Sequence, residues 1–367
     1  MQQYRVIISG GGTGGHIYPA IAIANAIKEA QPNAEILFVG ANGKMEMEKV
    51  PKAGYKIVGL DIVGLQRKLT LKNLAFPFKL MKSLSKAKKI VKDFNPDIAI
   101  GVGGYASGPL LRKAGGLNVP TMLQEQNSYP GLTNRLLAKK AMKICVAYDN
   151  MDRFFDAEKI VFTGNPVRKT ITDISGKKEA GRKHFGLDEE TKTLLVLGGS
   201  LGARTVNESI KSALKGFQEN GIQVLWQTGK GYIENVKAFI QEHGFTNVKA
   251  FDFIYEMDLA YASADVVVSR AGALSISELC VTGKASVLVP SPNVSEDHQT
   301  KNAMALVNQD AAILVKDDEA IETIEGTVVD LFNDNDRIIK LSSNIASFGR
   351  PNAAEAIANE AFKLMRN

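Results

Sequence analysis

Short apolar runs of four or five residues alternate along this chain with longer segments in which apolar positions recur at helical spacing. The short runs predict buried strands and the longer segments predict amphipathic helices, so the chain repeats a strand–helix–strand unit. Such units form α/β domains with mostly parallel sheets covered on both faces. In the first half the expected strands are Arg5–Ser9, Glu35–Val39, Lys56–Leu60, Ile98–Val102, Thr121–Gln124, Ile144–Ala147 and Lys159–Phe162. In the second half they are Thr193–Leu197, Gln223–Gln227, Val248–Phe251, Val266–Ser269, Ser286–Val289 and Ala312–Val315.

The rhythm is interrupted near Thr163–Pro166, where a polar, lysine-rich stretch follows. A chain of 367 residues is longer than one hydrophobic core usually supports, so two domains are expected. The last helical pattern, about Asn352–Met365, follows Gly349–Pro351, and the pattern alone leaves open which domain it joins.

Two segments share one local pattern of strand, glycine loop and helix. Arg5–Ser9 leads into Gly10–His16 and a helical pattern over Pro19–Ala30, and Thr193–Leu197 leads into Gly198–Arg204 and a second helix. Glycines allow tight turns and close approach of a ligand, and the N-terminus of the following helix attracts anions. The repeat predicts two Rossmann-like domains that face one another across a cleft.

Further unusual clusters also follow strands, and in parallel sheets ligands bind beyond the carboxyl ends of the strands. Because rigid scaffolds aim such loops, their coincidence at one sheet edge predicts a site. The clusters are Gly103–Pro109, Glu125–Asn127, Gly164–Arg168, Gly198–Ser200 and Arg270–Ala273.

Composition indicates a soluble globular protein without a signal peptide or a spanning segment: 45% of residues are hydrophobic and 23% are charged. Cys145 and Cys280, the only cysteines, lack metal-ligand spacing and are expected to be buried thiols of a reducing cytoplasm. Residues 1–163 hold 23 lysines and arginines against 12 acidic residues, and the remainder holds 22 against 27. This asymmetry predicts an anionic partner on the first half.

The first glycine loop fits the dinucleotide pattern G-x-G-x-x-G, but the second expected strand ends Phe38–Asn42 without the carboxylate that would hold a ribose. A nicotinamide cofactor is therefore disfavoured. His16 stands where the loop becomes a helix. It is either a helix-start residue with a satisfied ring or a general base, since imidazole titrates near neutral pH.

The second half offers candidate donor-site groups. Arg168 is either a surface ion-pair partner or a planar fork for a phosphate. Ser275–Glu278 is either a helix-start capping box or places Glu278 to accept from two ribose hydroxyls. Gln299 is a candidate for a sugar hydroxyl. A metal site is not expected, because Asp334–Asp336 fits a turn and the four histidines lack ligand spacing.

Seven lysines and no acidic residue lie between Lys72 and Lys92, interleaved with apolar residues. This pattern fits an ordinary amphipathic helix. It also fits a surface that rests on anionic lipid, because Phe76 and Phe78 precede the regular part and lie beside Lys79 and Lys82. Nucleic acid is disfavoured, since the chain has one Trp and no known reading motif.

Six ordered motifs together resemble the MurG family, the N-acetylglucosaminyltransferases of bacterial peptidoglycan synthesis. The resemblance spans nearly the whole chain and implies the GT-B fold, with the last helix packed on the first domain. The implied domains are residues 1–164 with 350–367 for the acceptor and membrane, and 165–349 for the donor. The motifs are Gly11–His16, Gly103–Pro109, Glu125–Asn127, Gly164–Arg168, Gly198–Arg204 and Ser269–Ala273.

The resemblance implies transfer of GlcNAc from UDP-GlcNAc, with inversion, to the C4 hydroxyl of N-acetylmuramic acid in lipid I, giving lipid II. It implies no metal and no tightly bound cofactor. It places the protein peripherally on the cytoplasmic face of the inner membrane, with other cell-wall enzymes as further partners. His16 would be the base and Gly103, Gly104 and Tyr105 would face the acceptor. Donor positions would be Thr13, Gly14, Gly15, Asn127, Arg168, Ser200, Ile254, Ala273, Leu274, Ser275, Ile276, Ser277, Glu278 and Gln299.

One departure from the family is visible, because Gln124 stands where many members have histidine. Two other classes of function stay open. The UDP-GlcNAc 2-epimerases share the two-domain architecture but need carboxylates around the sugar, and a non-catalytic nucleotide-binding module would not need His16.

Overall fold

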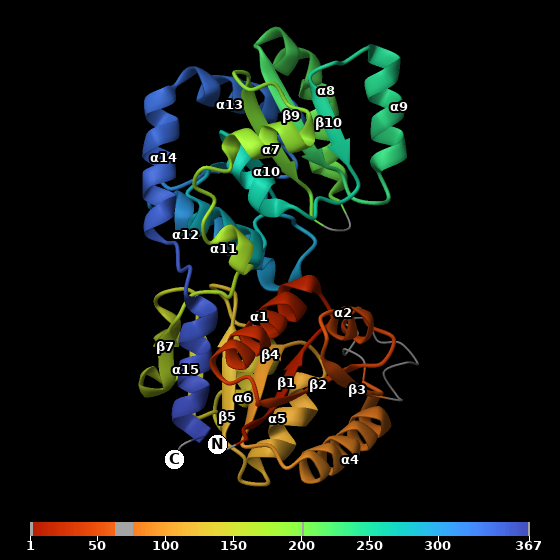
Figure 1. The fold of residues 1–367 in the computed structure, drawn as a ribbon, viewed down its shortest axis with the longest axis vertical. Coiled ribbons are helices and arrows are strands. Elements are labelled where there is room, and N and C mark those ends of the chain that lie inside the picture. The colour runs from red at the N-terminus through yellow and green to blue at the C-terminus, as the bar shows by residue number, and fades with distance from the viewer. Residues whose placement is uncertain (1–2, 63–75, 200–201, 366–367) are drawn as a thin grey trace. The chain divides into compact units, whose positions relative to one another are not determined.

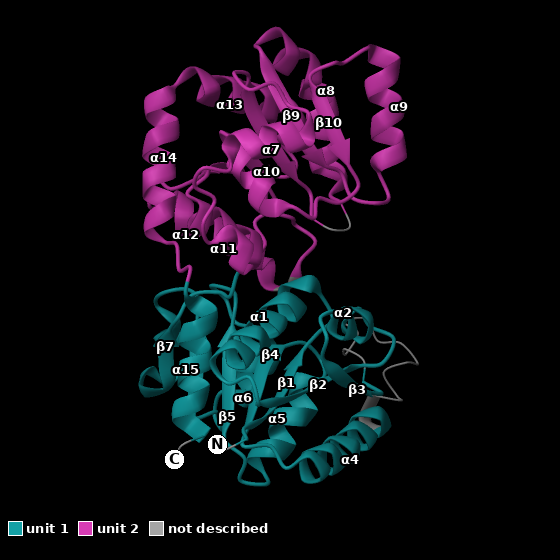
Figure 2. Ribbon diagram, viewed as in Figure 1, with its two compact units in different colours: residues 1–167, 352–367 teal, residues 168–351 magenta. Residues whose placement is uncertain are grey.

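The structure is a computed structural model that describes residues 3–62, 76–199 and 202–365. The chain divides into two compact units (Figure 2). Unit 1 comprises Met1–Val167 and Asn352–Asn367, and unit 2 comprises Arg168–Pro351. Each unit has its own sheet and core, so each is considered by itself.

Over its described residues, unit 1 has a seven-stranded sheet in the order β3-β2-β1-β4-β5-β6-β7, and all neighbouring strands are parallel. Val6 and Ile8 of β1 face one buried cluster and Ile7 faces the other. Burial on both faces explains why these strands are continuous apolar runs. The strands are β1 (Arg5–Gly10), β2 (Glu35–Ala41), β3 (Lys56–Leu60), β4 (Ile98–Gly103), β5 (Thr121–Glu125), β6 (Lys143–Val146) and β7 (Ile160–Phe162).

Helices cover both faces of this sheet (Figure 1). The C-terminal α15 (Ala353–Met365) packs against α1 (Gly14–Ala30) and completes the core on one face. The opposite face is covered by α4 (Phe76–Phe94) and α5 (Ser107–Gly115), and α6 (Leu132–Leu137) packs beside α5. Helix α2 (Glu46–Lys52) follows β2. Short 3₁₀ turns lie at Met151–Arg153 and Ala157–Lys159.

Unit 2 has a six-stranded sheet over its described residues, in the order β10-β9-β8-β11-β12-β13, again with parallel neighbours. Its strands are β8 (Lys192–Leu197), β9 (Ile222–Gln227), β10 (Val248–Phe251), β11 (Val266–Ser269), β12 (Ala285–Leu288) and β13 (Ile313–Leu314). Its helices are α7 (Lys178–Phe185), α8 (Arg204–Glu219), α9 (Ile233–His243), α10 (Met257–Ser263), α11 (Ala273–Thr282), α12 (His298–Val307), α13 (Ala320–Asn333) and α14 (Asn335–Ser347), with 3₁₀ turns at Lys169–Ile171 and Ser295–Asp297.

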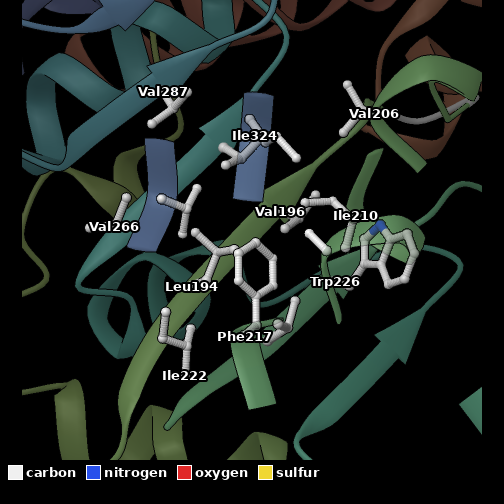
Figure 3. Close-up of a cluster of buried hydrophobic side chains, with 14 of the residues drawn as sticks. Leu194, Val196, Val206, Ile210, Phe217, Ile222, Trp226, Val266, Val287 and Ile324 are labelled. Atoms are coloured by element: carbon white, nitrogen blue, oxygen red, sulfur yellow. The ribbon is translucent and has the colours of Figure 1, made fainter. Parts of the chain in front are cut away.

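The core of unit 2 lies between its sheet and the helices α8, α13 and α14 (Figure 3). Phe217 and Trp226 are fully buried there, and the indole Nε1 donates to Asn207 Oδ1 at 3.1 Å. Burying such side chains stabilises the fold by about 1.5–3 kcal/mol each, relative to leaving them exposed. This core anchors the strands whose carboxyl ends carry the candidate donor-site residues.

The α/β class and the parallel sheets predicted from the sequence are confirmed. Some expected boundaries are wrong. Helix α1 begins at Gly14, so Pro19 lies inside the helix and does not start it. Strand β7 begins at Ile160, because a 3₁₀ turn occupies Ala157–Lys159. Asp334, expected in a turn, caps α14 by accepting from the Arg337 amide at 2.8 Å.

Candidate functional site

The first glycine loop of unit 1 joins β1 to α1. The amides of His16 and Ile17 donate to the Thr13 carbonyl at 3.1 and 3.2 Å. Thr13 is the N-cap residue, and within the described residues α1 has neither a side-chain cap nor an acidic residue in its first turn. The amides of Gly14 and Gly15 are therefore placed where an anion would meet the positive end of the helix dipole.

His16 is held in one tautomer by its own loop. Its Nδ1 lies 3.0 Å from the Gly11 carbonyl oxygen. A carbonyl can only accept, so Nδ1 carries the hydrogen and the lone pair of the neutral ring is on Nε2. The ring packs on Gly103, where a Cβ would lie 2.6 Å from His16 Cδ2 and 2.7 Å from Nε2. One ring nitrogen of His16 thus has a hydrogen-bond partner, which fits the first of the two interpretations made from the sequence. The resulting tautomer is also the one that a general base needs, which fits the second.

The loop after β4 interlocks with the first glycine loop. Gly103 and Gly104 have φ values of +106° and +92°, which favour glycine. The Gly11 amide donates to the Gly103 carbonyl at 3.3 Å, and a Cβ on Gly104 would lie 2.4 Å from the Gly11 carbonyl oxygen. Tyr105 follows and is 48% exposed. The Gly103–Tyr105 segment and His16 therefore share one surface of unit 1.

A buried carboxylate shapes the loop after β5. Glu125 Oε1 accepts from the Asn127 amide at 3.0 Å and from Asn127 Nδ2 at 3.3 Å. Its Oε2 accepts from the Gly131 amide at 3.1 Å and from Asn134 Nδ2 at 2.9 Å. Burial raises the pKa of Glu125, while these hydrogen bonds act in the opposite direction. Glu125 thus fixes the position of Asn127, a role that its motif alone did not indicate.

Gln124 belongs to a buried network of neutral amides. Its Nε2 donates to Asn165 Oδ1 at 2.8 Å, and its Oε1 accepts from Gln126 Nε2. Asn165 Nδ2 donates to the Gln126 carbonyl at 2.9 Å. All three side chains are buried, so hydrogen bonds replace water for each of them. The position at which the family often has histidine is therefore held here without a titratable group.

In unit 2, Arg168 and Glu278 form an ion pair, with Arg168 Nε 3.3 Å from Glu278 Oε1. The Tyr261 hydroxyl donates to Glu278 Oε2 at 3.0 Å. Burial raises the pKa of Glu278, and Arg168 and Tyr261 oppose that rise. Burial, followed by the nearby Glu278 carboxylate, raises the pKa of Tyr261 well above its usual range. The ion pair that was one of the two alternatives for Arg168 is present, and its partner is the candidate ribose-binding carboxylate.

The capping-box interpretation of Ser275–Glu278 is wrong. Helix α11 begins at Ala273 with Gly272 as an extended N-cap, so Glu278 lies within the helix. Ser277 Oγ donates to the Ala273 carbonyl at 2.9 Å. Among the described residues, no side chain caps the first turn of α11 and no acidic residue lies in it. The Ile276 amide donates to the Gly272 carbonyl at 2.9 Å, whereas the amides of Leu274 and Ser275 lie at the helix N-terminus, where they can face a phosphate.

The other donor-site candidates lie in segments that follow β8, β10 and β12 of unit 2. Ile254, after β10, is buried, and its amide donates to Gln227 Oε1 at 2.9 Å. Gln299 lies at the start of α12, and its Oε1 accepts from the Ser291 amide at 2.9 Å. In the second glycine loop, a Cβ on Gly202 would lie 2.4 Å from the Thr228 carbonyl oxygen. Ser200 of the same loop lies outside the described residues.

Helix α4 buries one side and exposes apolar groups on another. Ala87, Ile90, Val91 and Phe94 belong to the core, whereas Phe78 is 77% and Met81 is 70% exposed. Lys79 and Lys82 are exposed beside them, and Lys82 Nζ lies 3.6 Å from Asp61 Oδ2. The side chain of Phe76 lies outside the described part of the chain. No helix within the described residues is long and apolar enough to span a bilayer.

Within residues 3–62, 76–199 and 202–365, no group of three His, Cys, Asp or Glu side chains is placed to hold a metal ion. Both cysteines are free and buried, and burial raises the pKa of Cys145 and of Cys280 to about 12. Such thiols are poor nucleophiles.

Two family descriptions match the chain. The glycosyltransferase family 28 N-terminal domain matches residues 6–146, and the corresponding C-terminal domain matches residues 193–357. A curated relative from Cytophaga hutchinsonii is 58% identical over 362 residues, covering 99% of this chain and 97% of its own length. It is named UDP-N-acetylglucosamine–N-acetylmuramyl-(pentapeptide) pyrophosphoryl-undecaprenol N-acetylglucosamine transferase.

Solved structures agree on the fold. The crystal structure of Acinetobacter baumannii MurG matches with a TM-score of 0.80 and 28% identity, over 98% of this chain and 99% of that chain. A UDP-GlcNAc 2-epimerase from Neisseria meningitidis matches with a TM-score of 0.68 and 15% identity, over 99% of this chain and 100% of that chain. At that identity the epimerase shows a shared fold and nothing about activity.

Proposed function

The chain belongs to the family of UDP-N-acetylglucosamine–N-acetylmuramyl-(pentapeptide) pyrophosphoryl-undecaprenol N-acetylglucosamine transferases, and from that membership we propose a residue-level account of its reaction. It is a glycosyltransferase of the GT-B fold that moves GlcNAc from UDP-GlcNAc onto the muramyl sugar of lipid I, forming lipid II. The acceptor is the C4 hydroxyl, and the anomeric carbon inverts.

The observation that carries the catalytic assignment is the bound Nδ1 of His16. Because Nδ1–H donates to Gly11, the lone pair on Nε2 can take the proton of the acceptor hydroxyl. The C4 oxygen then forms a bond to the anomeric carbon as the bond from that carbon to the UDP oxygen breaks. The proton ends on His16 Nε2, and UDP leaves with the bonding electron pair.

Unit 2 holds the donor in this proposal. Glu278, oriented by Tyr261, accepts from the ribose hydroxyls, and the backbone at Ile254 contacts the uracil. The α11 N-terminus and Arg168 stabilise the charge that develops on the diphosphate. Gln299, Asn127 and the Thr13–Gly15 segment contact the sugar and phosphates. Fixed dipoles and a guanidinium suffice for this stabilisation, so the proposal includes no metal.

Gly103–Tyr105 faces the acceptor. The exposed Phe78 and Met81 of α4, with Lys79 and Lys82, hold the protein on the anionic cytoplasmic face of the inner membrane. An apolar patch beside cations suits binding to a membrane surface, because the apolar side chains enter the membrane interface while the lysine ammonium groups contact lipid phosphates.

The test incubates purified protein with UDP-GlcNAc and a lipid I analogue and measures UDP release. His16→Ala is expected to lose about 10²–10⁴-fold in kcat, the usual contribution of a general base, with donor binding retained. Absence of UDP release by the unaltered protein would sink the transferase assignment. Turnover of UDP-GlcNAc without acceptor would favour an epimerase, and full activity of His16→Ala would remove the base.

A further inference from the structure

In unit 1, a buried carboxylate other than that of Glu125 contacts the first glycine loop. Glu46, the first residue of α2, is only 1% exposed. Its Oε1 accepts from the Ala41 amide at 2.9 Å, and its Oε2 accepts from the Gly12 amide at 2.9 Å. Burying a carboxylate is costly unless hydrogen bonds compensate it, so these two amides are what keep Glu46 in this place.

The glycines around Glu46 make room for it. A Cβ on Gly11 would lie 2.3 Å from Glu46 Oε1, and a Cβ on Gly40 would lie 2.6 Å from Glu46 Cγ. Contacts under 3.0 Å are essentially never seen for real Cβ atoms, so neither position accepts a side chain while Glu46 keeps this place. The Glu46 carboxylate therefore occupies a space between the first glycine loop and the end of β2.

Glu46 and His16 bind the two ends of one peptide group. The carbonyl that accepts from His16 Nδ1 belongs to Gly11, and the amide that donates to Glu46 belongs to Gly12. The Gly11 carbonyl and the Gly12 amide are joined by a single planar peptide bond. A carboxylate on the N–H side polarises that peptide and makes its oxygen a stronger acceptor, because hydrogen bonds in a chain reinforce one another.

We propose that Glu46 is a positioning residue for the reaction, acting on His16 through the Gly11–Gly12 peptide. It holds the ring in the Nδ1–H tautomer and stabilises the imidazolium that forms when Nε2 takes the acceptor proton. No proton passes through the peptide to the carboxylate. This inference rests on the proposed role of His16 as the base.

The arrangement resembles a carboxylate that orients a catalytic histidine directly, except that here a peptide group lies between the two. The inserted peptide makes the coupling weaker than direct contact. It also fixes the loop, since Gly12 cannot move without breaking a charge-assisted hydrogen bond. Glu46 therefore links the geometry of the loop to the basicity of the ring.

The decisive variant is Glu46→Gln, which keeps the size of the side chain but has only one acceptor oxygen for two amides. We expect kcat to fall about 10- to 100-fold, by analogy with the loss found when a group that orients a metal-binding histidine is removed. The KM for UDP-GlcNAc is expected to stay within about twofold, since uniform donor binding is untouched. Glu48→Gln is the matched control, because Glu48 lies on the same helix with a 61% exposed side chain and should change neither value.

Two readouts separate this role from a purely structural one. The chain has four histidines, so ¹⁵N imidazole spectra, assigned with His16→Asn, can report the His16 tautomer directly. We expect the Nδ1–H form in the unaltered protein and a mixture with the Nε2–H form in Glu46→Gln. In a His16→Ala background, Glu46→Gln should cause no further loss of kcat per folded molecule, because its effect runs through the missing ring.

An unchanged His16 tautomer in Glu46→Gln, or an equal loss of kcat in the His16→Ala background, would overturn the proposal and leave Glu46 as a structural residue. Full kcat in Glu46→Gln would overturn it as well. A His16→Ala variant with normal kcat would instead overturn the base assignment in the proposed function. The two failures are therefore distinguishable.

Discussion

Replacing Gly103 with Ala tests whether the His16 ring position controls the reaction. The added Cβ would lie 2.6 Å from His16 Cδ2, whereas ordinary van der Waals contact begins near 3.4 Å. The ring must therefore retreat by about 0.8 Å, and a misplacement of about 1 Å at a reacting group can cost 10²-fold in rate. We expect kcat to fall about 100-fold, with the KM for UDP-GlcNAc nearly unchanged.

The backbone cost of this change must be separated from the collision. Gly103 has a φ of +106°, and a side chain in such a region costs about 1–3 kcal/mol. Gly54→Ala is the matched control, because Gly54 has a φ of +87° and a Cβ added there would meet nothing within 4 Å. Urea denaturation should show comparable losses of unfolding free energy in both variants, whereas the UDP-release assay should show a loss of kcat per folded molecule only in Gly103→Ala. Equal kcat in the two variants would refute the reasoning.

Three further predictions concern Tyr261, Glu278 and the exposed apolar side chains of α4. Tyr261→Phe removes the donor to the buried Glu278 carboxylate and should lower the free energy of unfolding by about 1.5–3 kcal/mol in urea titrations, and a change below about 0.5 kcal/mol would contradict it. Burial raises the pKa of Glu278, so folding favours its protonated form and this group's contribution to stability is lost as pH rises through the folded pKa. Glu278→Gln should therefore leave the thermal unfolding midpoint at pH 7 unchanged or higher. The same variant should raise the KM for UDP-GlcNAc about tenfold or more. A lower unfolding midpoint would show that the carboxylate is structural. Joint replacement of Phe78 and Met81 by Ser should weaken sedimentation with anionic vesicles, whereas Ile339→Ser, which changes an apolar group exposed by 57% in unit 2, should not.

The fold could be read from the sequence because its strands are buried on both faces. Uninterrupted apolar runs such as Val6–Ile8 and Leu194–Val196 have few alternatives to a parallel sheet covered by helices. Boundaries were harder, since 3₁₀ turns and helix starts depend on local hydrogen bonds. The helix start at Ala273 is an example, because an extended Gly272 precedes the pattern that resembled a capping box.

The candidate site was predictable only where its residues form contiguous motifs. His16 and Glu278 stand in or near glycine-rich loops that follow strands, so their position drew attention. Tyr261 lies in α10, 17 positions before Glu278, and only the folded chain brings its hydroxyl to that carboxylate. Glu46 stands four residues beyond Asn42, past the point at which a ribose-binding carboxylate would follow the second strand. Its function depends on a contact with Gly12 across 34 positions, which no local spacing encodes.

The two glycine loops share a pattern but have different reasons for their glycines. In the first loop, Gly11 admits the Glu46 carboxylate, and the loop that packs on it uses Gly103 to admit the His16 ring. In the second loop, Gly202 allows close approach to the Thr228 carbonyl and to the Tyr232 ring. A glycine in these loops therefore indicates close packing inside the protein as much as it indicates close approach of a phosphate.

This distinction narrows where an anion can bind in unit 1. The Gly12 amide is already occupied by Glu46, so it cannot also serve a phosphate without displacing that carboxylate. The amides of Gly14 and Gly15 lie further along the loop, at an uncapped helix start within the described residues. In the proposed function, the first half of the loop would then position His16, and the second half would be where an anion binds. A diphosphate would therefore find available amide donors in the second half of the loop, and the Gly12 amide would stay with Glu46.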